Sequence, residues 1–111
     1  LDSAVRNLRI LVRRCVVAVW RGDDVPVAYE DLIRRLAEAC RSIAQELAEH
    51  RLPAAARDQL REIGTASSHL QLTHSISTVV ILAQTRSIVV DMMELTGMEY
   101  HEARALIPDV D

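Results

Sequence analysis

The residues of this 111-residue chain that could carry chemistry lie mainly in its second half, where two histidines stand among serines and threonines. His69 and His74 are five residues apart, so they fall on different faces of a helix, whereas metal ligands on a helix stack at i,i+4. The sequence contains no HExxH motif, and a serine near a histidine without a glycine-rich elbow is weak support for a nucleophilic triad. We interpret this region as a polar helix face and expect no catalytic residue, metal or cofactor.

Arg86 and Asp91 interrupt the apolar blocks of the stretch 75–97, which we interpret as the central, buried helix. An unpaired buried charge is costly, so each of these side chains needs a partner. We predict a structural ion pair, either between the two residues or with neighbouring helices. The alternative is a ligand contact, in which Arg86 holds a carboxylate. Gly97 is expected to cap the C-terminus of this helix.

Composition limits the function classes that fit this chain. Half of the residues are hydrophobic, but only Trp20, Tyr29 and Tyr100 are aromatic, so the core must be aliphatic. The net charge is −3, and all 13 basic residues are arginines. Few stacking rings and no basic excess argue against nucleic-acid binding. Cys15 and Cys40 differ in height by roughly 10 Å in an antiparallel helical hairpin, too far for a disulfide, so two reduced thiols are expected.

Apolar periodicity predicts an all-α, up-and-down bundle of four main helices plus a short C-terminal helix, forming one domain over residues 1–111. We expect helices at about 2–21, 27–50, 54–63, 67–96 and 99–106. Pro26 and Pro53 mark helix starts, and Gly22 marks a helix end. Gly64 is the uncertain boundary, because it could end the third helix or lie within a longer one.

The first two helices have apolar stripes that we expect to face the core. The stripe of the second helix is formed by Tyr29, Leu32, Leu36, Ala39 or Cys40, Ile43 and Leu47. The stripe of the first helix is formed by Leu1, Val5, Leu8, Val12, Cys15 or Val16, and Val19. The first helix is also the basic element, with Arg6, Arg9, Arg13, Arg14 and Arg21. We interpret these arginines as a solvated face that pairs with acids on a neighbouring helix; the alternative is contact with anionic lipid.

The chain shows no signal peptide, and its start at Leu1 within an amphipathic pattern leads us to expect a fragment of a longer protein. Residues 64–85 lack charged side chains, so this segment has to be considered as a membrane span. More than half of its positions are Ser, Thr, Gln, His or similar residues, unlike the roughly 20 mainly apolar residues of a span. We therefore do not expect this segment to cross a membrane.

Several short segments resemble one protein family. These are AQTRS at 83–87, DMM at 91–93, GMEYHEAR at 97–104 and, more loosely, LDSAVRN at 1–7. They resemble the C-terminal cytoplasmic region of the fusaric acid resistance protein-like (FUSC) or aromatic acid exporter family. That family commonly has Asp-Leu-Leu where this chain has Asp91, Met92 and Met93, an exchange that keeps aliphatic volume.

The resemblance implies a soluble domain on the cytoplasmic face of a membrane protein that exports aromatic acids or related amphiphilic compounds. The transport pathway would lie in a membrane domain of the same polypeptide, and this part would serve homo-oligomer assembly or gating without catalysis. One alternative is a free-standing helical regulatory or adaptor domain. A second is a small all-helical enzyme of the chorismate mutase type, which the absence of lysine disfavours.

Overall fold

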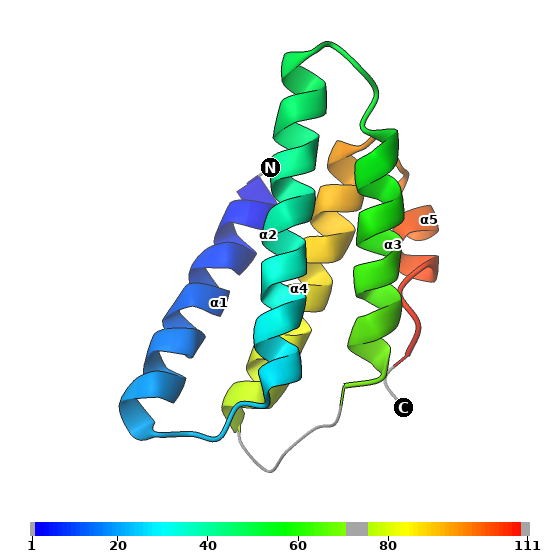
Figure 1. Cartoon of the computed structure of the whole chain (residues 1–111). Helices are drawn as coiled ribbons and strands as arrows, with labels where there is room; N and C mark the ends of the chain where they lie inside the picture. Colours follow the sequence, from blue (N-terminus) through cyan, green and yellow to red (C-terminus); the bar gives the residue numbers. More distant parts are fainter. Residues whose placement is uncertain (1, 71–75, 110–111) are drawn as a thin grey trace.

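The computed structural model describes residues 2–70 and 76–109, which contain five helices and no strand. Four main helices run alternately up and down: α1 (Asp2–Arg21), α2 (Val27–Ala48), α3 (Ala54–Ser68) and α4 (Ile76–Leu95) (Figure 1). The short helix α5 (Tyr100–Ala105) follows α4 and packs against it (Figure 1). The predicted up-and-down bundle with a short C-terminal helix is thereby confirmed.

Helix α4 is the centre of the bundle, because it contacts all four other helices. Its buried residues, among them Ile81, Thr85, Val89 and Met93, form a broad face, and the opposite side of the helix is exposed. By length and composition α4 alone, within the described ranges, could cross a membrane, but more than half of the apolar window is buried inside the bundle. Core helices of bundles share that composition. The prediction of a central, buried helix is correct.

The core is aliphatic, as composition predicts, and Tyr29 is the only aromatic residue among the buried side chains described. Helix α2 turns its predicted stripe inward through Tyr29, Leu32, Leu36, Ala39 and Ile43. Its last turn departs from the prediction, since Leu47 is 51% exposed and Glu46 is buried instead.

The predicted inward face of α1 is wrong. The buried residues of α1 are Ala4, Leu11 and Ala18, spaced seven apart and about a quarter turn away from the predicted stripe. Both rows are apolar, so periodicity does not distinguish them. Alanines at two of the three contact positions let α1 approach α4 closely, whereas a row of valines would hold the helices apart. The valine stripe of α1 is left facing outward.

The predicted boundary between the third and fourth helices is also wrong. Gly64 does not end α3, which continues through it to Ser68, and His69 is the C-cap residue. Helix α4 begins only at Ile76, so no single helix runs from 67 to 96; His74 lies outside the described residues. The hydroxyls of Ser67 and Ser68 donate to carbonyls three residues earlier, which satisfies these polar groups inside the last turn of α3.

The glycine at position 64 has a packing role. A Cβ atom there would lie 2.5 Å from Cδ1 of Ile107, so the missing side chain lets the segment after α5 pack against α3. Ile107 is buried as a result. This contact closes the core on the side of α3 that faces the C-terminal segment.

Three helices end in the same backbone motif. After α1, α2 and α4 the residue in the left-handed conformation is Gly22, His50 and Gly97, with φ of 69°, 57° and 96°. At Gly97 the backbone amide of Met98 donates to the carbonyl of Met93 and that of Gly97 to Glu94, the two bonds of a Schellman motif. The predicted capping role of Gly97 is confirmed.

Arg57 of α3 reinforces the end of α4. Its Nε donates to Thr96 Oγ1 at 3.1 Å and its Nη2 to the Thr96 carbonyl at 2.7 Å. A side chain at Gly97 would bring a Cβ atom within 3.2 Å of that Nη2. Backbone conformation and the arginine contact therefore both require glycine here.

We expect Gly97→Ala to lower the free energy of unfolding by about 1 to 2 kcal/mol, because alanine is strained in the left-handed region. Gly22→Ala is the matched control, since its Cβ would meet nothing within 4 Å. Denaturant unfolding of both variants separates the backbone strain, which both substitutions cause, from the close approach to Arg57, which only Gly97→Ala causes. Equal losses would contradict a role for the Arg57 contact.

At His50 we expect a substitution to raise the free energy of unfolding, the opposite of the effect at Gly97. It occupies the left-handed position where glycine is favoured, so His50→Gly should stabilise the protein by about 0.5 to 1 kcal/mol after the greater freedom of glycine in the unfolded chain is deducted. His50→Ala keeps the strain and should give no gain. A destabilised His50→Gly variant in thermal or urea unfolding would mean that the imidazole forms a stabilising contact.

Candidate functional site

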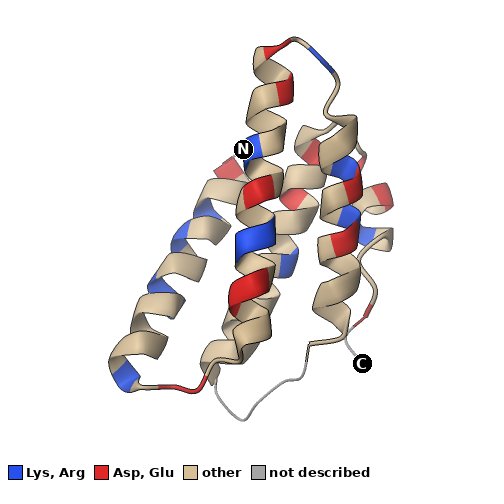
Figure 2. Cartoon of the chain, in the orientation of Figure 1, with Lys and Arg blue, Asp and Glu red and all other residues tan. Residues whose placement is uncertain are grey.

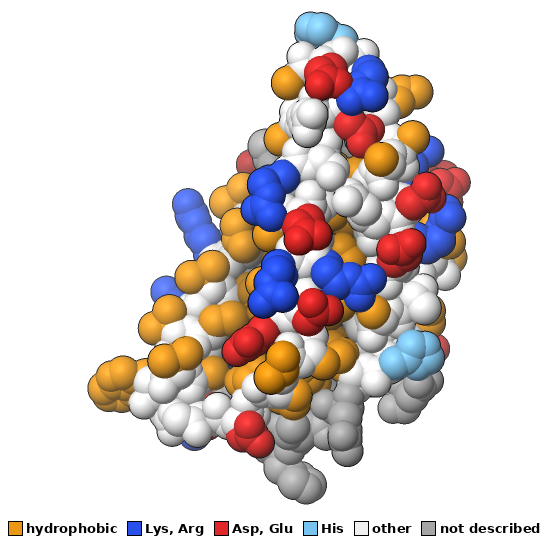
Figure 3. Space-filling model, viewed as in Figure 1, with side chains coloured by type: hydrophobic (Ala, Val, Ile, Leu, Met, Phe, Trp, Pro, Cys, Tyr) orange, Lys and Arg blue, Asp and Glu red, His pale blue; other side chains and the backbone are white. Residues whose placement is uncertain are grey.

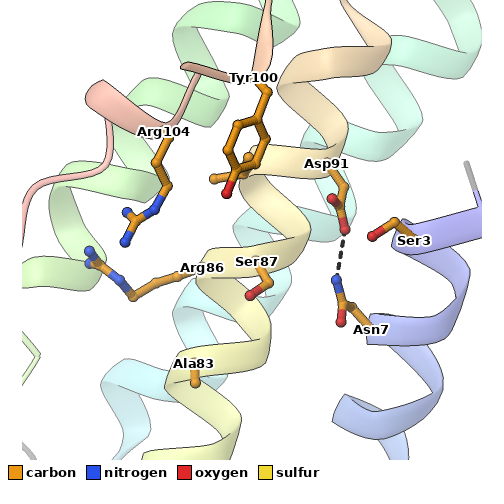
Figure 4. A pocket seen from close by; sticks show the side chains of 9 residues that line it. Ser3, Asn7, Ala83, Arg86, Ser87, Asp91, Tyr100 and Arg104 are labelled. Atoms are coloured by element: carbon orange, nitrogen blue, oxygen red, sulfur yellow. Dashed lines mark hydrogen bonds between the residues drawn. The ribbon is translucent and has the colours of Figure 1, made fainter. Parts of the chain in front are cut away.

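A polar pocket of about 440 Å³ lies where α1, α4 and α5 meet. Figure 4 shows its side chains converging from these three helices, with the two arginines at one end and the aspartate at the other. Its lining residues are Ser3, Asn7, Ala83, Arg86, Ser87, Val90, Asp91, Tyr100 and Arg104. The pocket thus contains both charged residues that the sequence singled out.

Arg86 is paired, but not as predicted. One Nη atom donates to the hydroxyl of Ser67 at 2.7 Å, and the other to the carbonyl of Pro108. The side chain therefore ties α4 to the end of α3 and to the C-terminal segment. Within residues 2–70 and 76–109 it forms no ion pair, so the prediction of a salt bridge with Asp91 or with a neighbouring helix is wrong.

Asp91 finds its partner on the opposite side of the pocket. Its Oδ2 accepts a hydrogen bond of 2.8 Å from the side-chain amide of Asn7, which joins α4 to α1 (Figure 4). An amide partner satisfies the carboxylate without the cost of bringing a second charge out of water. Arg86 and Asp91 thus hold α4 to different neighbours.

The cationic end of the pocket has an unusual arrangement. The guanidinium groups of Arg104 and Arg86 point toward one another, with the Tyr100 ring beside them (Figure 4). Burial, and then the charge of Arg104, lower the pKa of Arg86 from its ordinary value, while Asp109 opposes this shift. Two adjacent guanidinium groups are suited to bind a carboxylate or phosphate, so the ligand-contact alternative for Arg86 stays a hypothesis.

The structural role of Arg86 can be tested by comparing a substitution of Arg86 with the same substitution of Arg104. Arg86→Met should lower the free energy of unfolding by about 1 to 2 kcal/mol, because the bonds to Ser67 and Pro108 are lost. Arg104→Met is the matched control and should change stability by less than about 0.5 kcal/mol, since it removes mainly repulsion. Thermal unfolding measures both. A neutral Arg86→Met variant that no longer binds a carboxylate would instead assign Arg86 to a ligand.

A second concavity, about 390 Å³ in volume, runs between α1 and α2 over α4, and we call it the α1/α2 groove. Its lining side chains are apolar or a thiol: Ala4, Val5, Leu8, Leu11, Ile33, Leu36, Ala37, Cys40, Ile88 and Met92. It exists because α1 packs on α4 and makes no backbone approach to α2. Figure 3 shows hydrophobic side chains along this strip and at the C-terminal end of α1.

The cysteines are free, as predicted, and both are half-buried. Cys40 lines the α1/α2 groove, and burial raises the pKa of its thiol against a smaller opposing effect of Arg41. Burial alone raises the pKa of Cys15. A protonated, half-buried thiol is a weak nucleophile at neutral pH.

Charge is unevenly distributed over the helices. Figure 2 shows basic residues along α1 with an acidic residue only at its start, whereas α2 and α3 carry both signs. The four salt bridges between described residues are made by Arg34, Arg35, Arg51 and Arg61, and none involves α1. The prediction that the arginines of α1 pair with acids on a neighbouring helix is therefore wrong.

His69, the remaining candidate that the structure describes, lines neither the polar pocket nor the α1/α2 groove. His69 caps α3, and across the described ranges no group of three or more His, Cys, Asp or Glu could hold a metal ion. Sequence reasoning missed Asn7, Tyr100 and Arg104 as pocket residues, and Arg57 as the partner of Thr96. Asn7, Tyr100 and Arg104 lie in the segments 1–7 and 97–104 that resemble a protein family, but no apolar period or chemical motif predicts that they share a pocket.

Comparison with known proteins gives one informative similarity. The chain is 29% identical over 113 residues to a protein of Corynebacterium glutamicum described as uncharacterized. The aligned region covers 96% of this chain but only 29% of that protein, so the chain spans less than a third of the length of the relative it matches. No protein-family model and no solved structure matches the chain.

Proposed function

We propose that this chain is the cytoplasmic helical domain of a larger membrane exporter similar to the FUSC or aromatic acid exporter family. In this proposal it serves assembly or gating, and the chemistry of transport belongs to a membrane domain elsewhere in the same polypeptide. The relative from Corynebacterium glutamicum supports a larger protein, because the similar region is a minor part of its length.

The observation that carries the proposal is where the family-like segments meet in the fold. Segments 1–7, 83–87, 91–93 and 97–104 come from both ends of the chain, yet they supply every lining residue of the polar pocket except Val90. The family resemblance has more weight because the segments that carry it enclose one pocket and are not scattered over the surface. Contacts within the pocket also join α1 to α4, as the bond between Asn7 and Asp91 does.

The packing of α1 favours assembly as the role of the domain. Only three of its residues are buried, and its outward apolar residues include Val19 at 83% and Trp20 at 89% exposure. These outward apolar residues are available to contact another chain, a membrane surface or a neighbouring domain.

The proposal is tested on the full-length protein. We expect several segments of about 20 apolar residues outside this region, and recovery of the tagged full-length protein in the membrane fraction. A strain that lacks the gene should become more sensitive to aromatic carboxylic acids, and the full-length gene should restore resistance. The gene without residues 1–111 should fail to restore it although the product still inserts in the membrane.

The control is a full-length variant with Leu52→Glu, which changes an 86% exposed residue of the connection between α2 and α3. It should restore resistance like the native gene. A full-length protein that has no membrane segments and is recovered only in the soluble fraction would contradict the exporter proposal. The alternative function, a free-standing adaptor domain, would then be favoured.

A further inference from the structure

The polar pocket between α1, α4 and α5 carries opposite charges at its two ends. Arg86 and Arg104 stand at one end and Asp91 at the other, with Tyr100 between them (Figure 4). Arg86 and Asp91 are five residues apart on α4, so their backbone positions are separated by roughly 7.5 Å along the helix axis. A cavity with separated opposite charges is complementary to a ligand that is charged at both ends.

The positive end keeps hydrogen-bond donors that the protein does not use. Each guanidinium group has five N–H donors. Arg86 donates to Ser67 and to Pro108, and Arg104 forms no hydrogen bond or ion pair with any residue that the structure describes. The two guanidinium groups point toward one another and repel (Figure 4). A carboxylate between them would relieve the repulsion, and its two oxygens match the planar fork of arginine.

The negative end retains acceptors for a cation. Oδ2 of Asp91 accepts one hydrogen bond from Asn7, whereas an ionised carboxylate has about four acceptor positions. Ser3 lies beside Asp91 at the same end of the pocket and adds a hydroxyl oxygen (Figure 4). An ammonium group has three donors and no acceptor, so it complements this end of the pocket.

The charge balance distinguishes a zwitterion from a simple anion. Inside the pocket the two arginines are opposed by Asp91. They are also opposed by Asp109, which acts against the lowering of the Arg86 pKa by burial and by Arg104. These four charges sum to zero, so a ligand without net charge preserves the balance. A phosphate group, with a charge of about −1.5 to −2 at pH 7, would leave an excess of negative charge beside the two aspartates.

We propose that the polar pocket binds a small zwitterion, with its carboxylate between Arg86 and Arg104 and its ammonium group against Asp91. The axial separation of roughly 7.5 Å corresponds to an extended ω-amino acid such as ε-aminocaproate. The cavity volume of about 440 Å³ lies in the range of small-molecule sites. The inference goes beyond the proposed assembly role, and it requires no membrane domain.

The test is a titration of the 111-residue chain with ε-aminocaproate, caproate and hexylamine at constant ionic strength. Calorimetry gives the affinities, and the NMR signal of the Asn7 side-chain amide reports on the pocket, because this amide donates to Asp91. We expect ε-aminocaproate to shift this signal saturably. It should bind at least about tenfold more tightly than caproate or hexylamine, since each of these lacks one charged contact.

Substitutions separate the two ends of the pocket. Arg104→Met should weaken binding at least about tenfold and keep the native melting temperature, because Arg104 has no partner among the described residues. Asp91→Asn keeps an oxygen that accepts from Asn7, and it should abolish the preference for ε-aminocaproate over caproate. The matched control is Arg61→Met, the same change at an exposed position of α3 outside the pocket, which should bind like the native chain.

Three results would overturn the proposal. A native chain that shows no saturable binding of ε-aminocaproate up to about 10 mM has no such site. Equal affinity for caproate, or tighter binding of inorganic phosphate, would mean that the pocket recognises an anion alone. Binding that Arg104→Met leaves unchanged takes place elsewhere on the protein. Each result is independent of whether the full-length protein contains membrane segments, so failure here is distinguishable from failure of the exporter proposal.

Discussion

The structure depends on the requirement that the broad apolar face of α4 be covered. The buried residues of α4 spread over more than half of its circumference, so several other elements must pack against it to keep them from water. Helices α1, α2, α3 and α5 do this, and each uses a different means. Tyr29 and the leucines of α2 supply bulk, the alanines of α1 supply close approach, and Gly64 of α3 admits Ile107 from the C-terminal segment.

Polar contacts then fix the neighbours of α4 in place. Asn7 binds Asp91 from α1, Arg57 binds Thr96 from α3, and Arg86 reaches back to Ser67. All three join a charged group to a neutral one. Such pairing avoids the desolvation of two opposite charges and still leaves neither group unsatisfied. Arg86 and Asp91 of α4 therefore connect it to other elements, and the polar pocket lies between these two connections.

The same requirement explains why α1 differs from the other main helices. Covering α4 takes only the narrow row of Ala4, Leu11 and Ala18, so the larger apolar residues of α1 are not needed in the core. They remain on the surface beside the open α1/α2 groove. One row of α1 therefore holds the domain together, and the neighbouring apolar row is left exposed.

The sequence by itself determined the fold class, the order of the helices, the central position of α4, the inward stripe of α2 and the cap at Gly97. These follow from local signals, namely apolar periodicity, proline at helix starts and glycine in the left-handed conformation. Only the tertiary structure decided which of two apolar rows of α1 is buried, that Gly64 lies inside α3, and that Arg86 and Asp91 have separate neutral partners. The physical reason is that each of these depends on the shape or the polar groups of a second element, and a sequence pattern contains only the properties of its own helix.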